Sequence, residues 1–146
     1  MTSPNLDVFL TLRRTFAAPR DLVFRVWTEA EALESWFRPM GQPAKVVELD
    51  LCVGGGYCFE FRTPDGELHS ISGRYVEIER PEKLVFTWQS FITDDFETLV
   101  TLEFVERDGG KTEILLSHEH FPTQRMATEH QTAWNWMLDS LTNYLN

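Results

Sequence analysis

The stretch that decides the fold runs over residues 14–39 and reads R-T-F-A-A-P-R-D-L-V-F-R-V-W-T-E-A-E-A-L-E-S-W-F-R-P. Its first residues continue a strand that we predict over residues 8–16, where every second side chain shares one face. Pro19 suits the first turn of a helix, and the apolar residues after it recur at spacings of three and four. The pattern therefore predicts a strand that runs into a helix.

A second helix is predicted to follow the first directly. Thr28-x-x-Glu31 matches a capping box, in which two side chains pair with free backbone N–H groups at a helix start. Leu33, Trp36 and Phe37 are spaced to form the buried face of this helix. Two short abutting helices are thus expected after the first strand.

Six further strands are predicted between residues 45 and 120, because apolar and polar residues alternate there between turns rich in Gly, Pro and Asp. Short turns join consecutive strands, so these strands should pair antiparallel. In the segment 45–53, alternation assigns four residues to the inner face: Val47, Leu49, Leu51 and Val53. Gly73, inside a strand predicted over 68–79, indicates a bulge or a close approach of another backbone.

A long helix is predicted from about residue 123 to residue 144. Its apolar stripe consists of Met126, His130, Trp134, Met137, Leu138, Leu141 and Leu145. The fold class is therefore α+β: a curved antiparallel sheet of about seven strands with helices on its concave face. We expect residues 1–146 to form a single domain.

Composition narrows the class of partner. The net charge is -10, with only 13 Lys and Arg, so nucleic acid and anionic membranes are unsuited as partners. The first ten residues lack the basic and apolar regions of a signal peptide, and no apolar run could span a membrane. A cytoplasmic location is expected. Aromatic residues make up 13% of the chain and must fill a core or line a cavity.

Several motifs in this order are similar to those of a known family. They are R-T-F-A-A-P, the W-T…L-x-x-W-F helix pair, G-R-Y-V-E-I-E-R-P-E-K-L-V-F-T-W, G-G-K-T-E-I-L-L-S-H and A-W-N-W-M-L-D-S-L. The chain resembles the heat-shock protein 90 ATPase activator-like branch of the START-like (SRPBCC, birch-pollen-allergen-like) superfamily. The resemblance implies a helix-grip fold with a ligand cavity between sheet and long helix. Ala133 departs from the pattern, since the family usually has Gly there.

The inward aromatic residues are candidates for the wall of such a cavity, for which volumes of ~300–1,000 Å³ are usual. Solid core packing of the same residues is the alternative. The candidate ligand-binding residues are Trp36, Phe37, Phe59, Phe61, Tyr75, Phe86, Trp88, His118, Met126, His130, Trp134 and Met137.

Evidence for a metal site or for a site that binds a ligand carboxylate is weaker than the evidence for an aromatic cavity. His118, His120 and His130 could suggest a metal site, but no Cys or carboxylate stands at a ligand spacing, so we expect no metal and no cofactor. Arg14 or Arg38 could hold a ligand carboxylate, although a structural ion pair is the simpler reading for Arg14.

Cys52 and Cys58 lie symmetrically about the Gly54–Gly56 turn. A regular hairpin would place them opposite each other, at a separation compatible with a disulfide. A reducing cytoplasm would keep both as free thiols. Free thiols are the default expectation and a redox pair is the alternative.

Three functions remain open at this point. The first is a non-enzymatic carrier or sensor of a small hydrophobic molecule. The second is a protein-interaction module of the co-chaperone type, and a homodimer is also compatible with the resemblance. The third is an enzyme of the cyclase, dehydratase or hydrolase kind, for which Tyr75, Glu103 and His118 are the candidate groups. No nucleophile stands beside a base at a recognisable spacing, which favours a protein that is not an enzyme.

Overall fold

One curved antiparallel sheet and three α-helices make up the part of the chain that the computed structural model describes, residues 8–146. The strands pair in the order β1-β7-β6-β5-β4-β3-β2, and each pair is antiparallel. In chain order the elements are β1 (Phe9–Phe16), α1 (Arg20–Val26), α2 (Ala30–Trp36), η1 (Pro39–Gly41), β2 (Ala44–Leu49), β3 (Gly56–Arg62), β4 (Leu68–Glu79), β5 (Lys83–Ser90), η2 (Phe91–Thr93), β6 (Thr98–Arg107), β7 (Lys111–Glu119) and α3 (Gln124–Leu145). The predicted helix-grip fold is confirmed.

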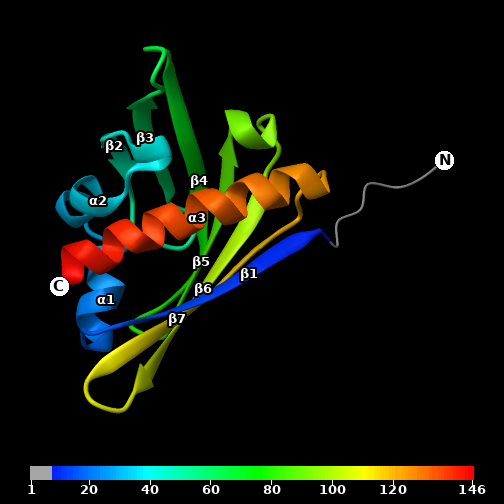
Figure 1. Cartoon of the computed structure of the whole chain (residues 1–146). Helices are drawn as coiled ribbons and strands as arrows, with labels where there is room; N and C mark the ends of the chain where they lie inside the picture. Colours follow the sequence, from blue (N-terminus) through cyan, green and yellow to red (C-terminus); the bar gives the residue numbers. More distant parts are fainter. Residues whose placement is uncertain (1–7) are drawn as a thin grey trace.

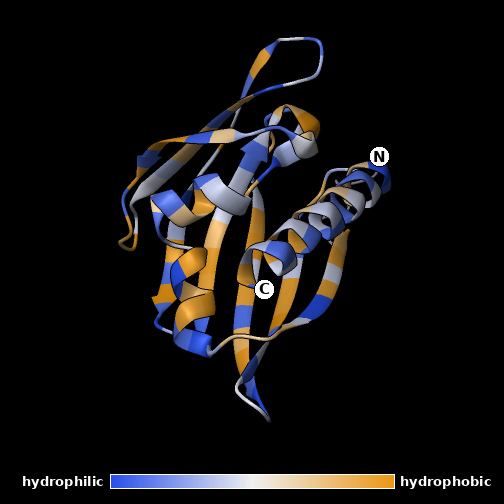
Figure 2. Ribbon diagram, turned by 60° about the vertical axis from the view of Figure 1, so that its left-hand side comes forward, coloured by the Kyte–Doolittle hydropathy of each residue, from blue (hydrophilic) through white to orange (hydrophobic). Residues whose placement is uncertain are grey.

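The long helix α3 crosses the sheet, and α1 and α2 lie beside its C-terminal end (Figure 1). Apolar and polar residues alternate along the strands, as a sheet with one buried face requires (Figure 2). The predicted inner faces of β3, β5, β6 and β7 are all buried. The core therefore lies between the concave face of the sheet and the three helices.

The N-terminal strand closes one side of this core. β1 pairs with β7, so that Leu10 lies opposite His118. Arg14 reaches from β1 to α3, where its Nη1 lies 2.7 Å from an oxygen of Asp139 and its Nη2 donates to Asn135. The expected ion pair for Arg14 is thus present, and it ties the first strand to the last helix.

The two helix starts differ from each other. Thr123 caps α3 as its hydroxyl accepts a hydrogen bond from the Met126 N–H. The predicted capping box at Thr28 is wrong: α2 begins after Glu29 without a side-chain cap. The Thr28 hydroxyl instead donates to the carbonyl of Phe24 in α1. Because the helices abut so closely, Thr28 completes the end of the first rather than the start of the second.

The prediction for β2 is partly wrong. A bulge between Val46 and Glu48 breaks the alternation, so that Val46, opposite Phe59, faces the core before the bulge and Leu49, opposite Tyr57, faces it after the bulge. Val47, the extra residue, is 52% exposed, and Val53, which lies in the turn, is 67% exposed, whereas Leu49 and Leu51 pack against the core as predicted.

The connection from Leu49 to Gly56, which is longer than a turn of three glycines, separates the two cysteines. Cys58 pairs with Glu48 across the hairpin, while Cys52 lies in the turn that follows β2. Both are free thiols. The predicted face-to-face placement is therefore wrong, and the expectation of free thiols agrees with the structure.

Gly73 marks a close backbone approach, one of the two alternatives expected for it. A Cβ atom there would come within 2.0 Å of the Thr87 carbonyl oxygen on β5 and 2.7 Å of the Tyr57 hydroxyl. The Tyr57 hydroxyl donates to that same carbonyl. Glycine thus lets β4 pass close enough for Tyr57 to span two strands. Among the helices of the described residues, none combines the length and apolar character needed to cross a membrane.

Candidate functional site

An inner cavity lies between the sheet and the three helices. Its walls come from α1, α2, β3, β4, β5 and α3 and consist of Trp27, Leu33, Phe37, Tyr57, Phe59, Tyr75, Leu84, Phe86, Trp88 and Trp134. The cavity volume is about 20 Å³, which is on the order of the room that one water molecule needs. All ten side chains are buried.

Aromatic packing explains why so little space remains. The rings of Phe37 and Phe59 have centroids 4.6 Å apart, and those of Trp88 and Trp134 lie 5.1 Å apart. Such separations are typical of rings in direct contact. The space between the sheet and the helices, as described by residues 8–146, therefore holds no cavity of several hundred Å³, and a ligand larger than water requires side chains there to move.

An outer cavity of about 30 Å³ lies next to the inner one, and Trp88 borders both. It is lined by Pro39, Met40, Phe61, Ile71, Trp88, Ser90, Phe91, Ile92, His130, Ala133 and Met137. Met40 and Phe91 are 42% and 40% exposed, so the lining reaches the protein surface at the short helices η1 and η2. We call this opening between Met40 and Phe91 the mouth.

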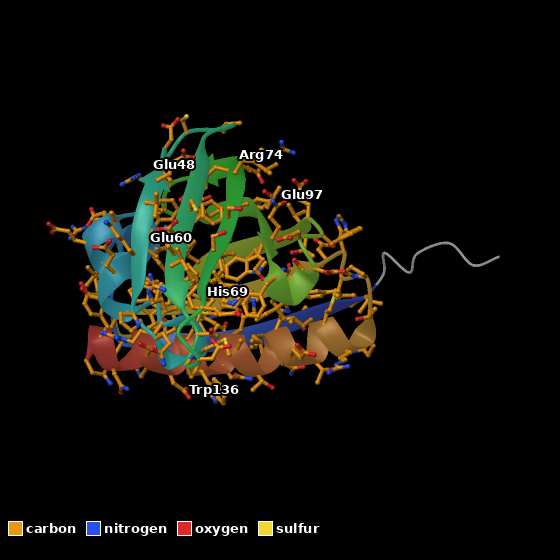
Figure 3. All side chains as sticks on the ribbon, turned by 90° about the horizontal axis from the view of Figure 1, so that it is seen from above. Glu48, Glu60, His69, Arg74, Glu97 and Trp136 are labelled. Atoms are coloured by element: carbon orange, nitrogen blue, oxygen red, sulfur yellow. The ribbon has the colours of Figure 1, made fainter. Side chains whose placement is uncertain are left out.

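The backbone around the mouth is irregular. Met40 adopts a left-handed conformation with φ of 54°, which is uncommon for a residue other than glycine. Phe91 stacks on His69 of β4, with ring centroids 4.1 Å apart. Figure 3 places His69 on the sheet side of α3 and Trp136 on the opposite side, where it points away from the sheet. The mouth and the exposed Trp136 thus lie on different faces.

Beside the inner cavity, His118 holds a fully paired polar network, which we call the His118 network. The Trp134 indole donates to His118 Nδ1 at 3.0 Å. Neutral His118 therefore carries its proton on Nε2, which lies 2.7 Å from the Thr98 hydroxyl. That hydroxyl donates in turn to the Trp88 carbonyl. Burial, with a smaller effect of His130, holds the pKa of His118 well below its usual value.

Three other buried polar atoms, all in residues that line the cavities, have no hydrogen-bond partner among residues 8–146. They are Nε1 of Trp27, Nε1 of Trp88 and Nε2 of His130. Their residues are no more than 4% exposed. An unpaired buried donor or acceptor costs ~1–3 kcal/mol, so this concentration at two adjoining cavities requires an explanation.

The proton position on His130 follows from its neighbours. Nδ1 lies 2.8 Å from the Met126 carbonyl oxygen, and a carbonyl can only accept, so Nδ1 carries the proton. Burial lowers the pKa of His130, which favours the neutral ring. Nε2 is consequently a free acceptor at the wall of the outer cavity.

Nine of the twelve candidate ligand-binding residues line one of the two cavities. Phe37, Phe59, Tyr75, Phe86 and Trp134 line the inner one, Phe61, His130 and Met137 the outer one, and Trp88 both. The other three, Trp36, His118 and Met126, line neither. Trp36 packs behind Trp27, and its indole donates to the Val26 carbonyl.

The sequence analysis missed several wall residues. Trp27 and Tyr57 are not among the candidate ligand-binding residues, because only the spatial arrangement of helix and strand makes them neighbours of Trp88. Met40 and Phe91 lie in irregular segments, where no periodic pattern indicates which way a side chain points. The left-handed backbone at Met40 could not be predicted, because methionine shows no preference for that conformation as glycine does.

The groups considered for metal binding or catalysis lie apart. The ring centroids of His118 and His130 are 5.1 Å apart, but His120 follows the end of β7 and is exposed. Tyr75 lines the inner cavity, where burial raises its pKa to about 12. Glu103 is exposed on β6 and lines neither cavity. Arg38 is also exposed and borders neither cavity.

Comparison with known proteins identifies relatives. A family model described as "Activator of Hsp90 ATPase homolog 1-like protein" matches residues 17–146. A search of curated proteins found no match. Among solved structures, a protein from Chromobacterium violaceum is 26% identical with a TM-score of 0.84, and the match covers 94% of this chain and 96% of that one. A protein from Rhodobacter sphaeroides is also 26% identical, with a TM-score of 0.82 and coverage of 94% and 91%. The AHSA1 protein from Silicibacter pomeroyi shares the fold at 23% identity, with a TM-score of 0.80 and coverage of 94% and 96%.

Proposed function

Because the chain belongs to the Activator of Hsp90 ATPase homolog 1-like family, we propose that it carries or senses a small hydrophobic molecule, bound in the interior between the sheet and α3. The observation that supports this most is the pair of adjoining cavities that share Trp88, the outer of which reaches the surface at the mouth. Apolar walls with a few polar groups are characteristic of small-molecule sites.

Trp88 has the key position in this proposal. Its side chain lines both cavities, and we expect a change in its rotamer to join them into one larger space. The energy for such a change would come from apolar surface that the bound molecule buries, at ~25 cal/mol per Å². We place this function in the cytoplasm, where Cys52 and Cys58 stay reduced.

Native mass spectrometry of freshly purified protein tests the proposal. We expect a discrete extra mass that disappears after extraction with organic solvent. Leu33→Phe, which fills the inner cavity, should lose that mass, while Leu68→Phe on the exposed part of β4 should retain it. A bare protein mass in every sample, with no uptake from a panel of lipids and small aromatics, would contradict a ligand-binding role.

A second candidate function is protein interaction, and Trp136 favours it. This side chain is 61% exposed and points away from the sheet (Figure 3). Exposed tryptophans are often anchors at protein interfaces. Trp136→Ala should then abolish capture of a partner from cell extract without changing the melting temperature. Equal capture by both proteins would eliminate Trp136 as the anchor.

A further inference from the structure

We propose that the bound molecule carries a neutral hydroxyl group, which lies between Trp88 Nε1 and His130 Nε2. This inference rests on the proposed function and specifies the chemical class of the ligand. Both side chains line the outer cavity, and their ring centroids are 6.4 Å apart at an interplanar angle of 75°. Each has one buried atom without a partner among the described residues.

The two atoms have opposite hydrogen-bonding character. The indole Nε1 of Trp88 can only donate. His130 Nε2 can only accept, because the proton of the neutral ring is on Nδ1 and is held by the Met126 carbonyl. A group that satisfies both must accept one hydrogen bond and donate another. A hydroxyl does this with a single oxygen atom.

Charged groups and pure hydrocarbons leave at least one of the two atoms unsatisfied. A carboxylate cannot donate to His130, and neither cavity is lined by Lys or Arg to compensate its charge. An ammonium group cannot accept from Trp88. A pure hydrocarbon leaves both atoms unpaired. The pair therefore favours a neutral group that both accepts and donates, and a hydroxyl is the smallest such group on an alcohol or phenol.

The hydroxyl also fixes the direction in which the molecule would lie. Trp88 lines both cavities but His130 lines only the outer one, so a group bound to both side chains lies on the side of the mouth. The apolar part of the molecule would then extend into the inner cavity, beside Phe37, Phe59 and Trp134. A water molecule could occupy the same position in the free protein, and a hydroxyl that replaces it keeps both hydrogen bonds.

Phenol, toluene and benzoate provide the test, because phenol and toluene differ only by hydroxyl against methyl. Each compound is titrated into the full chain while the indole N–H resonances are followed by NMR. We expect phenol to bind at least tenfold more tightly than toluene and benzoate to bind most weakly. The Trp88 resonance should shift in the phenol titration, whereas the Trp36 resonance should remain in place, since its N–H is already paired.

Two variants locate the selectivity. His130→Phe removes the acceptor and Trp88→Phe removes the donor, so each should reduce the preference for phenol over toluene to less than threefold. His120→Asn changes an exposed histidine whose left-handed backbone Asn tolerates, and it should keep the full preference. Thermal melting confirms that each variant is folded, and either of the first two variants suffices for the test.

The outcomes separate the two proposals. Equal binding of phenol and toluene would overturn the hydroxyl and leave the ligand-binding function in place. Tightest binding of benzoate, or a preference for phenol that survives both His130→Phe and Trp88→Phe, would also overturn the proposed position. Failure of all three compounds to bind would count against the cavities as a ligand site and hence against the proposed function itself.

Discussion

His118 and His130 are both buried, with ring centroids 5.1 Å apart, yet they differ in whether their ring nitrogens have hydrogen-bond partners. Both nitrogens of His118 are paired, and the network extends through Thr98 and Trp134. His130 pairs only Nδ1, and its other nitrogen borders the outer cavity. The same contrast divides the tryptophans, since Trp36 and Trp134 have paired indoles while Trp27 and Trp88 do not.

This difference separates structure from function within one core. A buried polar network in which every atom is paired specifies a unique packing arrangement. Unpaired atoms reduce stability, and they are retained where another molecule supplies the partner. The His118 network thus supports the fold, and the Trp88–His130 pair lies where we propose the ligand site.

Replacing the two histidines in turn should give the largest contrast. His118→Leu leaves Trp134 Nε1 without a partner and removes the hydrogen bond that the Thr98 hydroxyl accepts, and we expect a loss of about 3 kcal/mol in the free energy of unfolding. His130→Leu removes one hydrogen bond to a helix carbonyl and should cost less than about 1 kcal/mol. Urea denaturation measures both, and equal losses would show that the contrast has no energetic basis.

Conversion of each buried tryptophan to phenylalanine sharpens the comparison. The loss of ring volume is common to all four variants, but only Trp36→Phe and Trp134→Phe leave a buried acceptor unpaired. These two should be less stable than Trp27→Phe and Trp88→Phe by about 1–2 kcal/mol. Chemical denaturation of the four variants side by side provides the measurement. If Trp88→Phe proved the least stable of the four variants, the predicted order would be wrong.

The pH dependence of stability follows from the lowered pKa values of both histidines. Burial is the main cause for each, so the unfolded chain binds protons at a higher pH than the folded one. Stability should therefore decrease as the pH falls through about 6.5, the usual histidine value. From pH 6.5 to 5.5, His118 alone should account for about 1 kcal/mol, and His130 adds to it in the same direction. Urea denaturation at pH 6.5 and at pH 5.5 measures this loss of stability, which should be smaller in His118→Leu than in the unmodified protein.

Exchange of the indole protons with solvent should show the smallest effect. Trp88 borders the outer cavity, which reaches the surface, while the Trp134 proton is held by His118. We expect the indole N–H proton of Trp88 to exchange about tenfold faster than that of Trp134, since the Trp88 N–H can reach solvent without the loss of a hydrogen bond. Deuterium exchange followed by NMR measures both rates in one sample. Equal rates would mean that both sites open only together.

Much of the fold could be predicted from the sequence because it depends on alternation and helical spacing. The inward positions of Phe59, Trp88 and His118 follow from the period of their strands. The bulge after Val46 could not be predicted, because nothing in the residues around it distinguishes a bulged strand from a regular one.

The site was less accessible to sequence reasoning than the fold. Nine wall residues were predicted, since inward aromatic residues are the ones that border a cavity. The distances between strands and helices determine which of these wall residues have unpaired polar atoms. Whether His118 or His130 has a free nitrogen is decided by Thr98 and Met126, and periodicity contains no information about either contact.

The packed tryptophans also have an optical consequence. Trp27 lies within 4.7 Å of Trp36 and 6.1 Å of Trp134, and Trp134 lies 5.1 Å from Trp88, measured between ring centroids. Indoles held this closely in fixed orientations couple their electronic transitions and produce intense near-ultraviolet circular dichroism. This signal vanishes when side-chain packing loosens even if the backbone stays folded. Near-ultraviolet circular dichroism should therefore report the order of side-chain packing in the interior without an added label.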